Sequence, residues 1–293
     1  SSPARPHEPP AFDRGDSVMN TAMSAAFAVA GTALPADLSA PLVMPKRRVL
    51  RAYLTEIRYE FLHMLRTPVF VIPFLLLPAG VYLFSLMMAS RQFPGNPAVA
   101  TFLLVGFSVF ALTGPTLFGV GCPLAVERDA GLMKLKRAQP APTGAYLIAK
   151  MTMATLFAAI AMGTILLAAL CAGRLDLSAA RLLGLSAVLI AGSVPFAAIG
   201  LCIGAHVRGS AAPGITHLLY LPMLYLSGLF FPLPAALSRW AIVWPAFHLD
   251  RIALGIAGVA APASVPTVAS VAYLLGITAV CGAIASRRLA QVG

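Results

Sequence analysis

The sequence carries little charge, and acidic residues are especially scarce. Only 11% of its 293 residues are Asp, Glu, Lys or Arg, and ten of these are acidic. Soluble globular domains, in contrast, average about a quarter charged residues. Because 59% of the residues are also hydrophobic, the composition excludes an ordinary water-soluble domain.

Motifs for several kinds of chemistry are also missing. No C-x-x-C pair is present, so the sequence predicts neither a zinc site nor a redox motif. We expect the cysteines to be small buried hydrophobic side chains; they are Cys122, Cys171, Cys202 and Cys281. No G-x-x-x-x-G-K-[ST] sequence occurs, which excludes phosphate binding by a P-loop. We therefore expect no metal, nucleotide or catalytic residue on this chain.

Long apolar stretches dominate the rest of the sequence. Beyond residue 45, six stretches without charged residues reach the roughly 20 residues that a helix needs to cross about 30 Å of hydrocarbon. None shows the alternating pattern of membrane barrel strands. We predict an all-α integral membrane protein with six transmembrane helices, at about 69–89, 98–126, 144–173, 182–206, 211–233 and 267–286.

The net charge of +11 is distributed as a topology signal. If the first span starts on the inner side, 14 Lys and Arg residues lie inside and five lie outside, with two more in the first 45 residues. Lys and Arg are enriched in cytoplasmic loops, so we predict that both termini are cytoplasmic. Nucleic acid is not expected as a partner, because no solvated basic domain with interleaved aromatic residues is present.

Two different segments precede the first span. Residues 1–45 contain seven prolines and no periodic apolar face, which predicts a disordered tail. The alternative is a cleaved signal peptide at 18–34, although small polar residues dilute that stretch. Residues 46–66 place apolar side chains on one helical stripe and charges on the other faces, which predicts an amphipathic helix in the cytoplasmic membrane interface. Lys150, in the third span, is expected to reach the interface by snorkelling.

The segment 235–265 mixes apolar residues with aromatic and charged ones. A seventh span would place Asp250 and Arg251 at its centre, at a cost of about 5–7 kcal/mol. We therefore predict an outer interfacial or re-entrant hairpin with Trp240 and Trp244 at headgroup depth. No acidic residue then lies in any predicted span.

Helix-breaking residues concentrate in the second and fifth predicted spans. Proline in a membrane helix frees backbone carbonyls that neighbours or cavity water must satisfy. Such residues either line a pathway or allow tight packing through small side chains, and the sequence leaves both roles open. The candidates for a pathway or dimer interface are Gly114, Pro115, Pro222, Ser227, Gly228 and Pro232.

Two other functions are considered. A secondary carrier or channel usually has ionisable groups near the midplane, and the nearest candidates here are His206 and His217. We expect both to be satisfied by water or backbone carbonyls. A membrane-embedded enzyme would need a nucleophile with a base, such as Ser193 with His217, but no G-x-S-x-G sequence surrounds this serine.

Two motifs point to a family. The loop ERDAGLMKLKRAQP at 127–140, followed by Tyr146 and Lys150, resembles the E-R-x-x-G loop of type-2 ABC exporter permeases. The sequence YLSGLFFPL at 225–233 is similar to the S-G-x-x-[FY]-P ending of the fifth span in that family.

The resemblance covers residues 46–293 and implies a six-helix permease subunit with an interfacial elbow helix. Implied partners are membrane lipid, a second copy of the chain or a similar permease, and a separate ABC ATP-binding subunit that holds ATP and Mg²⁺. The resemblance also implies that the protein is an exporter in a bacterial inner membrane. Because no buried charge is predicted, the expected substrate is apolar or amphipathic. The residues implied to couple the permease to the ATPase are Glu127, Arg128, Gly131, Leu132 and Leu135.

Overall fold

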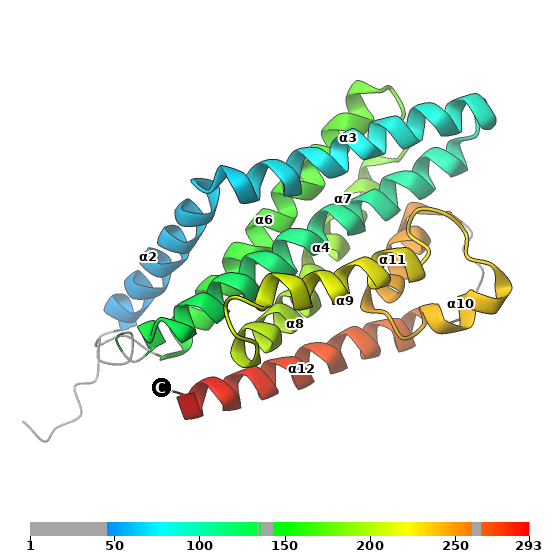
Figure 1. The fold of residues 1–293 in the computed structure, drawn as a ribbon. Coiled ribbons are helices and arrows are strands. Elements are labelled where there is room, and N and C mark those ends of the chain that lie inside the picture. The colour runs from blue at the N-terminus through cyan, green and yellow to red at the C-terminus, as the bar shows by residue number, and fades with distance from the viewer. Residues whose placement is uncertain (1–45, 134, 136–142, 260–264, 293) are drawn as a thin grey trace, which may run out of the picture. The chain divides into compact units, whose positions relative to one another are not determined.

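The computed structural model describes residues 46–133, 135, 143–259 and 265–292, and these form one compact unit. The predicted disordered tail at 1–45 lies outside the described residues. All regular elements in the described part are helices (Figure 1), which confirms the all-α prediction for that part.

The first two helices meet at a sharp corner. Helix α2 spans Lys46–Leu65 and helix α3 spans Pro68–Gln92. Between them, the Thr67 hydroxyl donates to the His63 carbonyl at 3.0 Å, and Pro68 occupies the first turn of α3. Proline is tolerated there because the first-turn N–H groups have no partner within the helix. The predicted amphipathic helix therefore exists as a separate element, and its position in a membrane interface stays a prediction.

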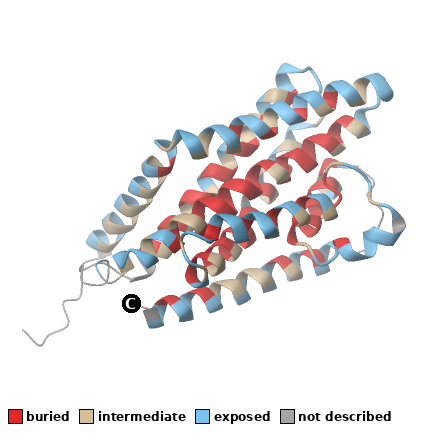
Figure 2. Ribbon diagram, viewed as in Figure 1, coloured by how far each residue is buried: buried red, intermediate tan, exposed pale blue. Residues whose placement is uncertain are grey.

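Helix α4 is the central element of the bundle. It spans Pro97–Asp129 and begins at Asn96, whose side chain accepts a hydrogen bond from the Ala98 N–H at 3.0 Å. Such a cap satisfies one of the unpaired donors of the first turn. Figure 2 shows that α4 is buried along most of its length, whereas α3 and α12 expose much of their surface. Helix α6, Thr143–Cys171, packs along α4.

The predicted fourth span is divided into two helices. Helix α7 spans Ala179–Ala191 and α8 spans Ser193–His206, with Gly192 between them. A Cβ added at Gly192 would lie 2.2 Å from a methyl group of Leu249, so a larger residue would force the Leu249 side chain to shift. Together the two helices still form a continuous candidate span.

The predicted fifth span is not a complete helix. Helix α9 spans only Ala212–Leu226, and its 15 residues cover about 22 Å, less than the roughly 30 Å of a hydrocarbon core. Ser227 ends the helix, Gly228 has φ +74°, and prolines follow at 232 and 234. Within the described residues, five helical segments are long and apolar enough to span a membrane: α3, α4, α6, α7–α8 and α12.

The predicted hairpin contains two helices, α10 (Ala235–Ala241) and α11 (Pro245–Ala257), before α12 (Thr267–Val292). Trp240 is exposed, but α11 is largely buried against α4, α7 and α12. Asp250 on α11 has no exposed surface. The expectation of no buried charge did not foresee this buried ionisable group, because the hairpin packs into the protein.

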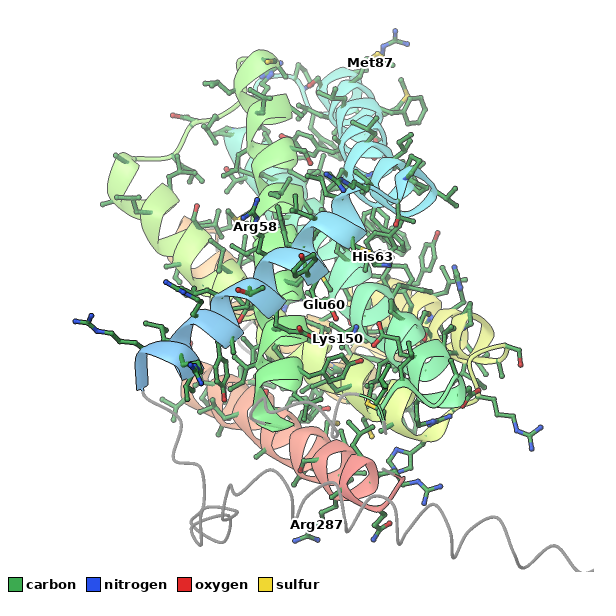
Figure 3. The ribbon with its side chains drawn as sticks, turned by 90° about the vertical axis from the view of Figure 1, so that its left-hand side faces the viewer. Arg58, Glu60, His63, Met87, Lys150 and Arg287 are labelled. Atoms are coloured by element: carbon green, nitrogen blue, oxygen red, sulfur yellow. The ribbon has the colours of Figure 1, made fainter. Side chains whose placement is uncertain are left out.

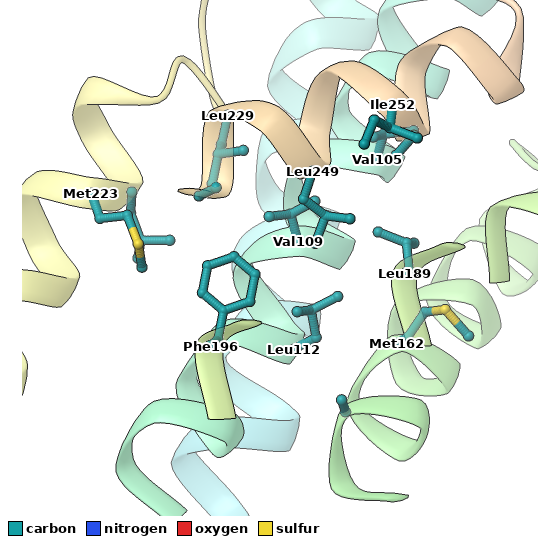
Figure 4. Close-up of a cluster of buried hydrophobic side chains, with 14 of the residues drawn as sticks. Val105, Val109, Leu112, Met162, Leu189, Phe196, Met223, Leu229, Leu249 and Ile252 are labelled. Atoms are coloured by element: carbon teal, nitrogen blue, oxygen red, sulfur yellow. The ribbon is translucent and has the colours of Figure 1, made fainter. Parts of the chain in front are cut away.

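The largest core cluster lies where these helices converge. Figure 4 shows Val109 and Leu112 of α4 facing Phe196 of α8 and Leu249 of α11, with Leu189 of α7 close by. This cluster fixes α11 against the N-terminal half of α4, a contact that sequence periodicity alone does not reveal.

The cysteines only partly follow the prediction. Cys171 is exposed, while Cys122, Cys202 and Cys281 are partly buried. The prediction is therefore wrong for Cys171, which lies at the exposed end of α6.

Candidate functional site

A buried ion-pair network joins three helices at one end of the bundle, which we call the Glu127 end. The Lys150 ammonium on α6 lies 2.9 Å from a Glu127 oxygen on α4 and 3.0 Å from a Glu60 oxygen on α2. Lys150 has no exposed side-chain surface, and the Tyr146 hydroxyl donates to the second Glu127 oxygen. Figure 3 shows Glu60 and Lys150 close together where α2 crosses α6.

Burial explains why these groups are paired. A charged group buried without a partner costs several kcal/mol, whereas paired and hydrogen-bonded charges are tolerated. The prediction that Lys150 snorkels is therefore wrong, since its ammonium group points into the protein and bridges two carboxylates. The contribution of Glu60 is not visible in the sequence, because Glu60 lies 90 residues before Lys150.

The next residue, Arg128, binds the end of α8. Its guanidinium donates to the Gly204 carbonyl at 3.0 Å and to the Val207 carbonyl at 2.9 Å. The last carbonyls of a helix have no partner within the helix, and a nearby cation also interacts favourably with the helix dipole. Arg128 therefore caps α8 from a different helix.

Asp129 extends the same connection to the turn before α9. One carboxylate oxygen accepts the Gly209 N–H at 2.7 Å, and the other accepts from the Arg128 guanidinium at 2.7 Å. Three consecutive residues thus bind different elements. Glu127 binds α6, and through Lys150 also α2; Arg128 binds α8; and Asp129 binds the turn into α9. This segment therefore holds several elements together at the Glu127 end.

Beyond Asp129 the helix ends in a turn, and the following leucines are exposed. Gly131 has φ +74°, a conformation that disfavours residues with a side chain. Residues 132, 133 and 135 are helical, and Leu132 and Leu135 are 40% and 62% exposed. The basic remainder of the motif loop at 127–140, residues 134 and 136–140, lies outside the described residues. All five predicted coupling residues therefore lie on one continuous segment at the Glu127 end.

Two predicted pathway residues, Gly114 and Pro115, are buried in the middle of α4. A Cβ added at Gly114 would lie 2.3 Å from the Phe74 ring of α3 and 3.3 Å from the Tyr220 hydroxyl of α9. Gly114 therefore marks the place where α3 and α9 approach α4 closely.

The other four pathway candidates follow the chain from α9 into the loop after it. Ser227 is buried and its hydroxyl donates to the Met223 carbonyl, and Gly228 begins the left-handed turn. A Cβ added at Gly106 of α4 would lie 2.0 Å from the carbonyl oxygen of Leu229, so this loop contacts α4 closely. Pro222 is partly buried and Pro232 is exposed, so the six candidates do not form one continuous lining.

Glycines on α4 and α8 have a packing role. A Cβ added at Gly200 would lie 2.8 Å from the Leu117 carbonyl, and one at Gly204 would lie 2.7 Å from the Gly121 carbonyl. The four-residue spacing of the α8 glycines is typical of membrane helices whose backbones pack closely. Tight packing through small residues is thus established for Gly121, one of the two roles that the sequence left open.

The residues proposed for other functions do not form a site. The Ser193 hydroxyl donates to the Ile190 carbonyl at 2.7 Å and lies 3.4 Å from the Thr155 hydroxyl. His217 is exposed and bonds the Pro213 carbonyl, while His206 bonds the Cys202 carbonyl. Among the described residues, no group of three metal-ligating side chains occurs.

Large apolar side chains on the surface also bear on function. Helix α3 presents a shallow apolar groove, lined by Ile72, Pro73, Leu76, Leu77, Gly80, Val81 and Phe84. Leu167 and Leu170 on α6 are also about 60% exposed. Such extended apolar surface is incompatible with water and is expected where helices face lipid or another subunit.

Comparison with known proteins agrees with the motifs. Residues 51–256 match the ABC-2 type transporter family. The chain is also similar to the protein named "Putative transport permease YvfS" of Bacillus subtilis (strain 168), with 24% identity over 195 residues. That alignment covers 64% of this chain and 78% of the relative.

Proposed function

Because this chain belongs to the ABC-2 type transporter family and is a membrane subunit of a transporter, we propose that it is the permease of an ATP-driven exporter. A separate ABC ATP-binding subunit supplies the energy, holding ATP and Mg²⁺. The chain itself contains no P-loop sequence. Its own task is to convert movement of that partner into movement of helices.

The single observation that carries this proposal is the set of contacts made by Glu127, Arg128 and Asp129. They bind α6, the C-terminal end of α8 and the turn into α9 directly, and α2 through Lys150. The exposed leucines 132 and 135 follow immediately and offer an apolar surface to a partner. A partner that pulls or pushes this segment therefore acts on most of the bundle at once.

We propose six crossings, with the Glu127 end on the cytoplasmic side of a bacterial inner membrane. Helix α9 begins beside Asp129, and α12 ends with Leu289 packed in the same cluster as Tyr146. Because α12 is long enough to span and ends at the Glu127 end, it begins at the opposite end of the bundle. The chain must therefore cross between the start of α9 and the start of α12, and we propose that α9 and residues 227–234 make this crossing together. The excess of Lys and Arg at the Glu127 end supports this orientation, with both termini cytoplasmic.

The proposed transport pathway follows the face of α4 that contacts α9 and the loop after it. Gly114 lies on this face, and Ser227 ends α9. The surrounding side chains are apolar or hydroxyl-bearing, which favours an apolar or amphipathic substrate. Exposed apolar residues on α9, including Leu218 and Tyr225, support pairing with a second copy or a similar permease.

Co-purification with the ATPase encoded beside this chain tests the proposal most simply. In lipid vesicles containing both proteins, export should require ATP, and a Glu127→Ala/Arg128→Ala double variant should lose it. Transport that follows an ion gradient without nucleotide would instead identify a secondary carrier. Normal export by the double variant would refute the coupling role.

A further inference from the structure

Asp250 is a buried carboxyl group without a hydrogen-bond partner. Its side chain has no exposed surface, and both of its oxygen atoms lack any donor. The adjacent Arg251 does not compensate it by a hydrogen bond, because the guanidinium lies over the Phe247 ring at 5.0 Å and its Nε is itself unpaired. Asp250 thus differs from the paired carboxylates at the Glu127 end.

The helices around α11 supply no other charge to Asp250. Helix α4 contributes no charged side chain between Pro97 and Val126, and α9 contributes none along its length. On α7, Arg181 lies at the far end of α11, beside Gly258. Arg251 is the one charged group that acts on Asp250 among the described residues.

The titratable neighbours on α11 and α12 are already engaged. His248 contacts the Ser270 hydroxyl through Nδ1 at 3.1 Å and the Ile242 carbonyl through Nε2 at 2.8 Å. Since a carbonyl can only accept, Nε2 carries a proton and donates to Ile242. Desolvation by burial lowers the pKa of His248, which favours the neutral imidazole. Tyr273 of α12 stacks on this ring at 4.1 Å and donates to the Val243 carbonyl. These contacts attach the hairpin to α12 and do not reach Asp250.

An ionised carboxylate in this position is strongly disfavoured. Without water or donors, a buried carboxyl group takes up a proton instead of remaining charged. Desolvation by burial raises the pKa of Asp250 to about 8, while Arg251 acts in the opposite direction. The geometry and the physical chemistry agree that the neutral acid fits this site.

We propose that Asp250 is a proton-binding site whose occupancy is linked to the position of α11. While α11 is packed against α4 and α12, the carboxyl group holds its proton. When α11 withdraws and water reaches the side chain, the O–H bond breaks, the proton passes to water, and the carboxylate remains. Proton binding therefore stabilises the packed hairpin, and proton loss favours its release.

The linkage has a definite sign. The carboxyl pKa is near 4 when the group is in water and about 8 when α11 is packed. Between these values the packed state binds more protons, so its stability falls as pH rises from about 4 to about 8 and then levels off. Asp250→Asn, a neutral side chain of the same shape, removes the dependence of packing on pH and makes the packed hairpin more stable at neutral pH.

Infrared spectroscopy of the purified, lipid-reconstituted chain tests the proton directly. The wild-type protein should show the C=O band of a protonated carboxylic acid at about pH 6, and the band should titrate away near pH 8. Asp250→Asn should lack it. Asp176→Asn, the same change at an exposed acid, should keep it. A wild-type spectrum without such a band, or a band unaffected by Asp250→Asn, would overturn the proposal.

Amide hydrogen exchange of α11, corrected for the intrinsic pH dependence, tests the link to movement. Protection of α11 in the wild-type chain should fall at least about tenfold between pH 5 and pH 8, as the linkage requires. In Asp250→Asn it should stay constant. Equal protection at both pH values in the wild-type chain would show that the proton is bound without controlling the hairpin. Neither experiment involves an ATPase, so both outcomes are independent of the proposed transport function.

Discussion

The Glu127 end and the α11 hairpin both bury charge-bearing side chains, but they compensate them differently. At the Glu127 end, Lys150 is paired with two carboxylates, and Arg128 binds two helix carbonyls. In the hairpin, Asp250 has no partner. Paired charges fix helices to one another over a wide pH range, whereas an unpaired acid makes its helix sensitive to protons. The first arrangement suits a mechanical joint, and the second suits an element that moves.

Removing the central cation should give the largest effect. Lys150→Met removes the cation that bridges Glu60 and Glu127, and breaking a buried ion pair by removing one partner costs about 3–5 kcal/mol. We expect a lower thermal midpoint and loss of α2 attachment, measured by unfolding scans and limited proteolysis. Lys150→Arg is the control and should retain most of both properties. An unchanged midpoint in Lys150→Met would show that the network does not fix the joint.

Removing the cap on α8 should give the next largest effect. Arg128→Gln loses the two hydrogen bonds to Gly204 and Val207, each from a charged donor and worth about 1.5–3 kcal/mol when buried. Because Arg128 is only partly buried, we expect the free energy of unfolding to fall by about 1.5 kcal/mol for the two hydrogen bonds together. Unfolding midpoints measure the loss. Arg208→Gln, at an exposed arginine in the neighbouring turn, should change the midpoint little. Equal effects of the two substitutions would argue against a specific cap.

A smaller effect is expected at the turn after α4. Gly131→Ala forces a side chain into a conformation with φ +74°, at a cost of about 1 kcal/mol. Nothing lies within 4 Å of the added Cβ, so the cost is conformational and not steric. Gly163→Ala, in a helix with the same open space, should instead stabilise slightly. Unfolding midpoints that shift in the same direction for both would contradict this account.

The sequence predicted the parts of the molecule that depend on local pattern. The long apolar stretches predicted helices, and the described part of the chain is all-α with five helical segments long enough to span a membrane. Contacts between distant segments could not be predicted in this way. Glu60 joins Lys150 across about 90 residues, and neither residue alone indicates the other.

The errors have a common physical origin. Asp250 and Lys150 were assigned to the membrane interface because charges in lipid are costly, but other parts of the protein enclose both. The short α9 also escaped prediction, because hydropathy does not detect where Ser227 and Gly228 end a helix. Hydropathy describes a helix facing lipid, and it fails where helices face one another.

The central claim is that the segment after Glu127 receives movement from an ATP-binding subunit. A Leu132→Ala/Leu135→Ala double variant tests it most directly, because both side chains are exposed and their loss should leave the fold intact. Leu167→Ala/Leu170→Ala, at exposed leucines of α6, is the matched control. We predict that the first variant, with an unchanged unfolding midpoint, loses co-purification with the ATPase by at least about tenfold, equivalent to about 1.4 kcal/mol. ATPase binding that equals that of the control would contradict the account.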